Sequence, residues 1–410
     1  MMRKVLFLLR TYNDIDHITP VIWKALKEGE KPIVFFWEKY DHRADYRLRY
    51  LRDNYGLEIV YPGSVFGPLG KISLKFRYNR LFASRFLEKN GISACVFDYA
   101  PGLSREDILG KRGVPDFFGR GISDIREAFL AACRDTGVET FCLPHGLRVY
   151  MNEDPTERSR TLLEKTGKLS DMSDRNIYDH YVFQSRYHRE DSIKRGMDPG
   201  KCHVWGSARF CPEWARTNLE LCGDFSPAKD DSGRLKVVFM LSHWGYNIDE
   251  KALFSLVYAM ADLPFVYLFV KDQPRGTGSL PAQDKEKLGR LPNVEVSCDN
   301  SQHSPAIIKW ADVVMNFGSS IGIEALQQGK VLVNPSYIHT NYTVFDETEA
   351  CIRAGSERDV LDLLEGINAG KDVRVPEENK RVLYREAVYG RDREYDVLGE
   401  YYSNIFKSQQ

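Results

Sequence analysis

Residues 311–335 run A-D-V-V-M-N-F-G-S-S-I-G-I-E-A-L-Q-Q-G-K-V-L-V-N-P, and this stretch decides the fold. Residues 312–317 form a short apolar run with β-branched side chains, which predicts a buried strand. Gly318-Ser319-Ser320 predicts a tight turn, and residues 321–328 carry apolar side chains at helical spacing. Gly329 stands where a helix ends, and another apolar run follows it. The stretch therefore predicts one strand–helix–strand unit of a parallel α/β sheet.

The turn in this unit is a candidate phosphate site. Its backbone N–H groups, two hydroxyls and the positive end of a helix dipole are expected at the carboxyl edge of the sheet. We therefore predict that Ser319 and Ser320 bind phosphate and that Glu324, one helical turn further on, binds a ribose. An ordinary helix N-cap explains the same residues, so the motif needs support from other features.

Strand–helix alternation continues on both sides of this unit and predicts two parallel sheets. Residues 222–234 are rich in Gly, Pro, Ser and charge, which is typical of a linker. We predict an N-terminal Rossmann-like domain over 1–222 and a nucleotide-binding Rossmann-like domain over 235–385. The remaining residues, 386–410, are expected to form a helix that packs back on the first domain. Near the N-terminus, a helix is expected over 19–27, with Asp16 or Thr19 as its N-cap.

Composition excludes several classes of protein. The chain has 410 residues, 43% of them hydrophobic, a formal net charge of −1 and a pI of about 6.8. No apolar run is long enough to cross a bilayer, and the first apolar run is strand-sized and lacks the features of a signal peptide. The eight cysteines are scattered, without metal-ligand spacing, as in reduced cytosolic proteins. We therefore expect a cytoplasmic globular protein that holds no metal or cofactor and binds no nucleic acid.

A histidine and a glycine follow a predicted strand in Cys142-Leu-Pro-His145-Gly146. In doubly wound sheets ligands bind at this edge, so His145 is a candidate general base or phosphate ligand. Other strands deliver carboxylates to the same edge. The loop that contains Asp14, Asp16 and His17 follows the first strand, and Asp98 ends another. The catalytic candidates are therefore His145, Asp14, Asp16 and Asp98.

Further phosphate ligands are expected near other strand ends. Gly206-Ser207 offers backbone and hydroxyl donors, and Arg209 offers a positive charge. The segment Val270-Lys-Asp-Gln-Pro-Arg275 follows a strand of the second half, as does His243. The predicted donor-binding residues are Gly206, Ser207, His243, Lys271, Gln273, Arg275, Ser319, Ser320 and Glu324.

Several of these motifs resemble those of GT-B glycosyltransferases. The stretch 311–335 is similar to their nucleotide-diphosphate motif and to that of the related nucleotide-sugar 2-epimerases. The His145-Gly146 segment and residues 181–210 resemble those of bacterial surface-carbohydrate enzymes. This group includes capsule and O-antigen Kdo transferases and teichoic acid glycerophosphotransferases. The glycerophosphotransferase and capsule families often carry Lys-x-His-Pro in the segment that follows Val270, and this chain has Gln273 in place of the histidine, which departs from their pattern.

The resemblance implies a GT-B α/β fold, with two doubly wound Rossmann-like domains facing a cleft. It also implies a metal-independent glycosyltransferase of lipopolysaccharide O-antigen or capsule biosynthesis. The donor would be CMP-Kdo or a UDP-sugar, and the acceptor a glycan or a lipid-linked molecule. Two alternatives stay open: a nucleotide-sugar 2-epimerase of the same fold, which needs no acceptor, and a non-catalytic nucleotide-sugar-binding protein.

Residues 71–85 interleave basic and aromatic side chains. A solvated helix face explains this pattern. The alternative is contact with an anionic membrane surface or with a lipid-linked acceptor. With that alternative, the protein would lie on the inner face of the cytoplasmic membrane.

Overall fold

The computed structural model describes residues 3–10, 12–36, 41, 43–63, 78–98, 125–229, 231–242, 245–272, 280–299 and 301–407. The chain divides into two compact units. The first unit comprises residues 1–147, 171–214 and 385–410, and the second unit comprises residues 148–170 and 215–384. Each unit is built on one parallel sheet.

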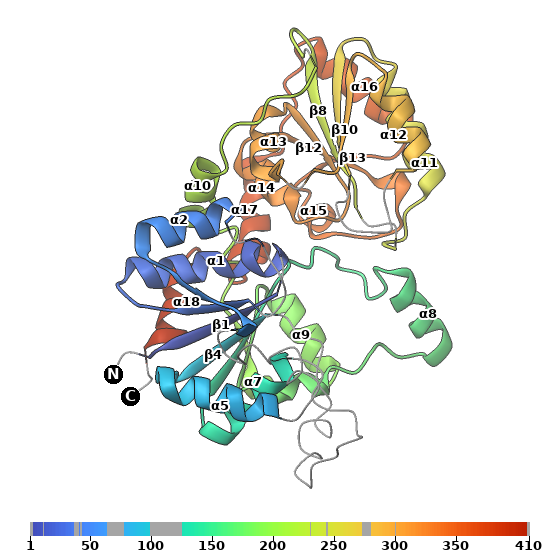
Figure 1. The fold of residues 1–410 in the computed structure, drawn as a ribbon. Coiled ribbons are helices and arrows are strands. Elements are labelled where there is room, and N and C mark those ends of the chain that lie inside the picture. The colour runs from blue at the N-terminus through green and yellow to red at the C-terminus, as the bar shows by residue number, and fades with distance from the viewer. Residues whose placement is uncertain are drawn as a thin grey trace. The chain divides into compact units, whose positions relative to one another are not determined.

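The sheet of the first unit has the strand order β3-β2-β1-β4-β5-β6-β7 (Figure 1). The register pairs, such as Leu6 with Ile33 and Leu6 with Cys95, are parallel throughout. Its strands are β1 (Val5–Leu9), β2 (Ile33–Phe36), β3 (Glu58–Val60), β4 (Ala94–Asp98), β5 (Glu139–Leu143), β6 (His180–Phe183) and β7 (Cys202–Val204).

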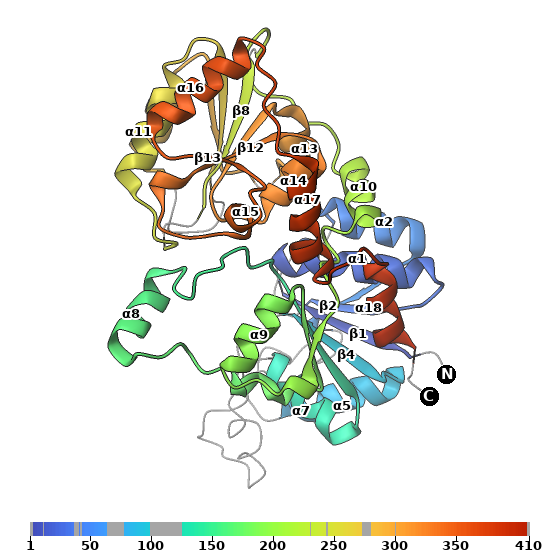
Figure 2. The same ribbon diagram turned by 180° about the vertical axis from the view of Figure 1, so that it is seen from behind.

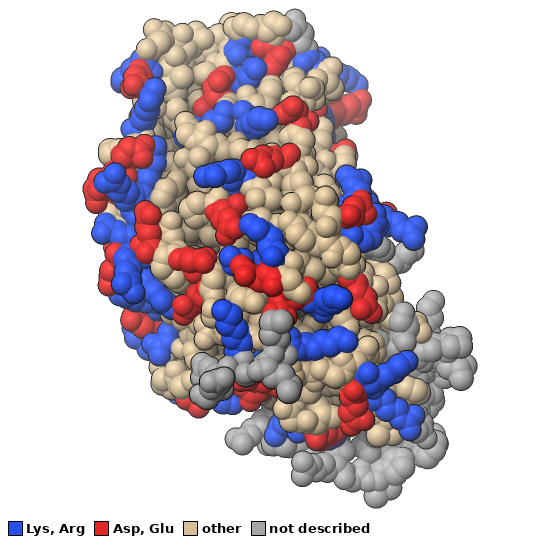
Figure 3. Space-filling model, turned by 90° about the vertical axis from the view of Figure 1, so that its left-hand side faces the viewer, with Lys and Arg blue, Asp and Glu red and all other residues tan. Residues whose placement is uncertain are grey.

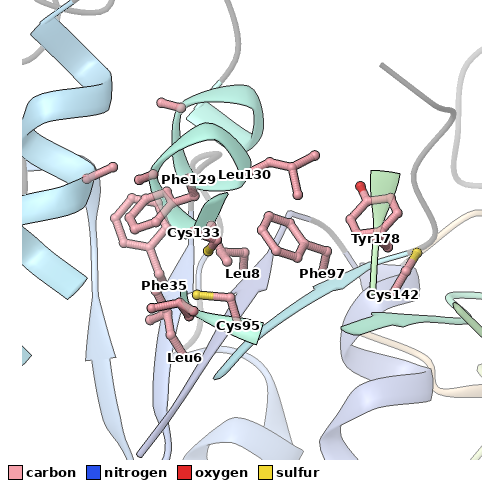
Figure 4. Close-up of a cluster of buried hydrophobic side chains, with 14 of the residues drawn as sticks. Leu6, Leu8, Phe35, Cys95, Phe97, Phe129, Leu130, Cys133, Cys142 and Tyr178 are labelled. Carbon is pink, nitrogen blue, oxygen red and sulfur yellow. The ribbon is translucent and has the colours of Figure 1, made fainter. Parts of the chain in front are cut away.

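Helices cover both faces of this sheet. Helices α5 (Tyr78–Asn90) and α7 (Ile125–Thr136) lie side by side on one face, and α1 (Tyr12–Lys27) and α18 (Val397–Phe406) lie on the other (Figures 1 and 2). Figure 4 shows the core under α7, where Phe129 and Cys133 meet the strand residues Phe35, Cys95 and Phe97. Shorter helices are α2 (Tyr46–Tyr55), α9 (Arg186–Lys194), and the 3-10 turns η1 (Ser173–Ile177) and η2 (Pro199–Lys201).

The second unit repeats the plan with the strand order β10-β9-β8-β11-β12-β13. Helices α11, α12 and α16 cover one face, and α13 and α14 the other (Figure 1). Its strands are β8 (Leu235–Met240), β9 (Val266–Lys271), β10 (Val294–Ser297), β11 (Val313–Asn316), β12 (Val331–Pro335) and β13 (Ile352–Ala354). Its helices are α8 (Glu157–Thr166), α11 (Glu250–Ala261), α12 (Ala282–Gly289), α13 (Ser304–Trp310), α14 (Ile321–Gln327), η3 (Ser336–Ile338), α15 (Val344–Glu347), α16 (Glu357–Asn368) and α17 (Glu377–Leu383). Helix α10 (Pro212–Leu221) spans the boundary between the units.

Three features differ from the sequence-based expectations. Helix α1 begins at Tyr12, so neither Asp16 nor Thr19 is its N-cap, and Pro20 lies inside the helix. Residues 148–170, which the prediction placed in the domain 1–222, group with the second unit. The C-terminal segment is not one helix. It contains a π-helix, η4 (Tyr384–Tyr389), a break, and then α18, whose N-cap is Asp396.

Charged side chains of both signs are interspersed over the face in Figure 3. Part of the basic segment 71–85 lies outside the described residues. In the described part of this segment, the Arg80 guanidinium pairs with Asp135 on α7. Among the described helices, none is both long and apolar enough to cross a membrane.

Candidate active site

Both sheets have a switch point, where the chain leaves two neighbouring strands in opposite directions. In the first unit it lies between β1 and β4, and in the second between β8 and β11. Ligands of open parallel sheets bind in the crevice at the carboxyl ends of such strands. The side chains that follow these strands are therefore the candidates for a ligand site.

At the first switch point the structure brings together three of the predicted catalytic residues. Asp14 comes from the start of α1, Asp98 ends β4, and His145 follows β5. The Nδ1 atom of His145 lies 3.3 Å from Asp98 Oδ2 and 3.6 Å from Asp14 Oδ1. Both carboxylates are buried, whereas the imidazole is partly exposed. Because Nδ1 faces both carboxylates, they hold the imidazole in one orientation. A base held by a buried carboxylate in this way can accept a proton, since the carboxylates stabilise the imidazolium.

The same three side chains form a candidate metal site. One donor atom from each of Asp14, Asp98 and His145 lies within 4.8 Å of the other two. Carboxylate and imidazole donors suit several divalent cations. The sequence analysis expected no metal, on the basis of cysteine spacing. This group contains no cysteine, and its members come from three separate elements, so no local spacing indicates it.

Asp16, the fourth predicted catalytic residue, faces two arginines instead. Its Oδ1 pairs with the buried Arg47, and its Oδ2 lies 3.1 Å from Arg209 Nη1. Arg47 in turn lies 2.7 Å from the carboxylate of Asp45, the N-cap of α2. Both oxygens of Asp16 therefore face arginines, and its role as a base stays a prediction.

Gly206 and Ser207, whose binding of the donor stays a prediction, pack against the C-terminal segment. The backbone N–H of Ser207 donates to the carbonyl of Val388 at 2.6 Å, and Ser207 is fully buried. Gly206 has φ +76°, and a Cβ there would lie 2.6 Å from the same carbonyl. Because the C-terminal segment occupies the space around this turn, its N–H is not available to a phosphate.

At the second switch point the turn Gly318-Ser319-Ser320 is held by three polar contacts. Ser242, after β8, donates its hydroxyl to the carbonyl of Phe317 at 2.7 Å. The side-chain amide of Asn316 donates to the carbonyl of Ser319 at 2.7 Å, and Ser319 Oγ accepts from the N–H of Ile321 at 3.4 Å. Ser319 and Ser320 are both half-buried, and Glu324 is buried in the first turn of α14. Their roles in binding phosphate and ribose stay predictions.

A tyrosine from residues 148–170 packs against this turn. Gly318 has φ +70°, and a Cβ there would lie 2.4 Å from the hydroxyl oxygen of Tyr150. The Tyr150 ring stacks on Tyr246, with centroids 4.9 Å apart. Asn341 ties the same segment to the loop after β8, because its amide donates to the carbonyls of Pro155 and Tyr246. The sequence analysis missed these residues, because their contacts are long-range and follow no local pattern.

The remaining donor-binding candidates are only partly described. Lys271 ends β9, and its ammonium donates to the backbone carbonyl of Asp299. Burial lowers the pKa of Lys271 from its usual value. His243, Gln273 and Arg275 lie outside the described residues.

The fold is of the GT-B type, with two parallel-sheet α/β domains, and solved structures share it over nearly their whole length. UDP-GlcNAc 2-epimerase from Neisseria meningitidis, bound to UDP-GlcNAc, is 11% identical, with a TM-score of 0.58 over 98% of this chain and 99% of that chain. S. aureus MnaA with UDP is 10% identical, with a TM-score of 0.56 over 100% and 99%. UDP-GlcNAc 2-epimerase from Methanocaldococcus jannaschii is 12% identical, with a TM-score of 0.54 over 93% and 98%. No known family model and no curated protein matches the chain in sequence.

Proposed function

We propose that this chain is a nucleotide-sugar 2-epimerase that acts on a UDP-linked sugar without an acceptor. The observation that carries the proposal is the Asp14–Asp98–His145 cluster at the first switch point. The neighbours that share the fold support it, since two of them are UDP-GlcNAc 2-epimerases, one with UDP-GlcNAc bound. An epimerase needs a group that carries a proton, and the cluster can supply one.

Inversion at C2 of a sugar requires that the C2 proton leaves one face and that a proton returns on the other. In the proposed step, Nε2 of His145 takes the C2 proton, and the C2–H electron pair forms a C1=C2 double bond. The C1–O electron pair leaves with the nucleoside diphosphate. The diphosphate then adds back at C1, C2 takes a proton from solvent water on the opposite face, and His145 releases its proton to solvent. Asp98 accepts the Nδ1–H of His145 and stabilises the imidazolium.

We assign phosphate binding to the second unit, through Ser319 and Ser320, and ribose binding to Glu324. Backbone N–H groups and hydroxyls at the start of a helix stabilise a leaving phosphate without a metal. We therefore propose that turnover is independent of metal. If turnover required a divalent cation and chelation abolished it, the Asp14–Asp98–His145 group would instead be a metal site.

The test is to incubate the protein with UDP-GlcNAc in D₂O, without an acceptor, and to follow the sugar by proton NMR. We expect the C2 epimer to appear with deuterium at C2. We expect the His145→Ala variant to form little of this epimer and to incorporate little deuterium. Unchanged UDP-GlcNAc, with no deuterium at C2, would contradict the proposal for this substrate.

A glycosyltransferase is the second candidate, and the His145–Asp98 hydrogen bond favours it as well. The same pair suits removal of a proton from an acceptor hydroxyl. In this case the donor would be CMP-Kdo or a UDP-sugar, and the acceptor a glycan or lipid-linked molecule of O-antigen or capsule synthesis at the membrane surface. A thermal-shift screen with UDP, CDP, CMP and GDP separates the two, because a nucleotide that binds the folded state raises the melting temperature. A shift with CMP alone would favour the Kdo-type transferase. A shift with UDP fits both the epimerase and a UDP-sugar transferase, and acceptor-free turnover of UDP-GlcNAc then separates these two.

A further inference from the structure

His17 lies close to the catalytic cluster but is not part of it. It follows Asp14 by three residues on α1, so the two side chains share one face of the helix. Its side chain is buried, with 6% of its surface exposed. Phe210 packs against it edge-on, with ring centroids 6.1 Å apart. A buried imidazole needs partners for its polar atoms, so its hydrogen bonds define what it can do.

Gln184, which follows β6, determines which imidazole nitrogen of His17 carries the proton. The Gln184 Nε2 atom lies 3.2 Å from His17 Nδ1 and 3.3 Å from Ser207 Oγ. An amide NH₂ has two hydrogens to donate, so Nδ1 of His17 and the Ser207 hydroxyl are the two acceptors. The proton of a neutral His17 is then on Nε2. Among the described residues, the His17 side chain makes one hydrogen bond, through Nδ1.

The C-terminal segment holds Gln184 and Ser207 in place. Gly390 has φ +63°, and a Cβ there would lie 2.2 Å from the backbone oxygen of Gln184. The Val388 carbonyl accepts the N–H of Ser207 at 2.6 Å, and the Tyr401 hydroxyl donates to the carbonyl of Gly206 at 2.8 Å. The Gly206-Ser207 turn therefore contacts both the C-terminal segment and Gln184, the residue that donates to His17.

The surroundings of His17 keep it neutral. Burial lowers the pKa of His17 well below its usual value of 6.5, and the charges of Arg209 and His145 lower it further. The nearby acidic groups are themselves engaged: Asp16 pairs with Arg209 and Arg47, and Asp14 faces His145. A neutral histidine can therefore donate a hydrogen bond without carrying a charge.

We propose that His17 donates a hydrogen bond through Nε2 to the substrate oxygen that gains negative charge as the diphosphate leaves, and that Gln184 is the positioning residue for this donor. This inference rests on the proposed epimerase function and adds a second group to it. His145 carries the proton, whereas His17 keeps its own proton and stabilises charge. No bond to His17 forms or breaks.

The first test reads the tautomer directly by NMR of the full-length protein with ¹⁵N-labelled histidine. We expect His17 to be protonated at Nε2 and not at Nδ1 throughout the neutral pH range. We expect the Gln184→Leu variant to populate both tautomers. Addition of UDP-GlcNAc should shift the Nε2–H signal of His17. A proton on Nδ1, or an Nε2–H signal that UDP-GlcNAc leaves in place, would overturn the inference.

The second test measures the turnover of UDP-GlcNAc by two variants with different substitutions of His17. The side-chain amide of His17→Gln can place an N–H near the position of Nε2, whereas His17→Leu cannot. We expect His17→Leu to lower kcat about 10²-fold, with little change in KM, and His17→Gln to restore much of the loss. His303→Gln, a histidine substitution in the second unit, is the matched control. Equal losses for His17→Leu and His17→Gln would overturn the inference.

The two proposals fail in different ways. If the wild-type protein does not epimerise UDP-GlcNAc, the proposed function fails for that substrate, and the NMR test still decides the role of His17 as an oriented donor. If the wild-type protein is active but His17→Leu turns over normally, the epimerase stands and His17 has no part in it.

Discussion

The two switch points have the same topology but different chemistry. After β1, β4 and β5 the first unit delivers two carboxylates and an imidazole, which meet within 4.8 Å. After β8 and β11 the second unit delivers hydroxyls, an amide and glycines, which shape the turn at Gly318. The first set can carry protons, and the second can bind an anion. A parallel sheet therefore determines where a site forms, and the residues just after its strands determine what the site can do.

The largest expected effect comes from removing a carboxylate from the proton-carrying site of the first unit. Asp98→Asn removes the carboxylate that lies 3.3 Å from His145 Nδ1. We expect kcat for acceptor-free turnover to fall about 10³-fold, because the amide does not stabilise the imidazolium. UDP affinity, measured by calorimetry, should stay unchanged. Asp135→Asn, which breaks only the ion pair with Arg80, is the control and should keep full activity. Normal turnover by Asp98→Asn would remove Asp98 from the site.

The anion-binding side can be tested by comparing two glycines with almost the same backbone angle. Gly318 has φ +70° and Gly329 has φ +69°, but only Gly318 has a neighbour, Tyr150, within 4 Å. Alanine at either position should cost about 1 kcal/mol for its conformation. Gly318→Ala should cost about 2 kcal/mol more, because its Cβ overlaps the Tyr150 ring. Urea unfolding measures both. Tyr150→Ala combined with Gly318→Ala should recover part of the extra loss, and equal losses for the two single variants would contradict the packing of Tyr150 on the turn.

The smallest expected effect concerns the pH dependence of folding. The pKa of His17 is lowered in the folded protein, mainly by burial, so the unfolded chain binds a proton at this residue that the folded chain does not. The resulting stability is full above the unfolded pKa of 6.5 and is lost as the pH falls below it. Between about pH 7.5 and pH 5.5, His17→Gln should therefore lose about 1 kcal/mol less of its free energy of unfolding than the wild type. Parallel pH profiles for the two proteins would contradict the low pKa.

The sequence predicted most strands and helices, because they depend on local periodicity. Asp98 ends β4, and β5 precedes His145, as predicted. The prediction started this helix at residue 19, because proline is well tolerated in the first turn of a helix. The structure instead starts α1 at Tyr12 and places Pro20 inside it. The insertion of residues 148–170 into the second unit was also missed, because no local pattern records which sheet a segment joins.

The candidate site was predicted less completely, for a similar reason. Asp14, Asp98 and His145 were found because they follow strands, and parallel strands end at one edge. Asp16 met the same criterion, but its partners Arg47 and Arg209 are distant in sequence. Ser207 also met it, yet Val388 already accepts its N–H. Position after a strand indicates where a side chain lies, and only the three-dimensional contacts show whether it is already engaged.

The most direct test of the account crosses the two switch points in one experiment. UDP affinity and acceptor-free turnover of UDP-GlcNAc would be measured for His145→Ala and for the double variant Ser319→Ala/Ser320→Ala. The account predicts that His145→Ala binds UDP like the wild type but loses turnover. It also predicts that the double variant binds UDP about tenfold more weakly, as expected for the loss of about 1.4 kcal/mol, and keeps kcat at saturation. If His145→Ala weakened UDP binding while the double variant lost only kcat, the division of tasks between the two units would be contradicted.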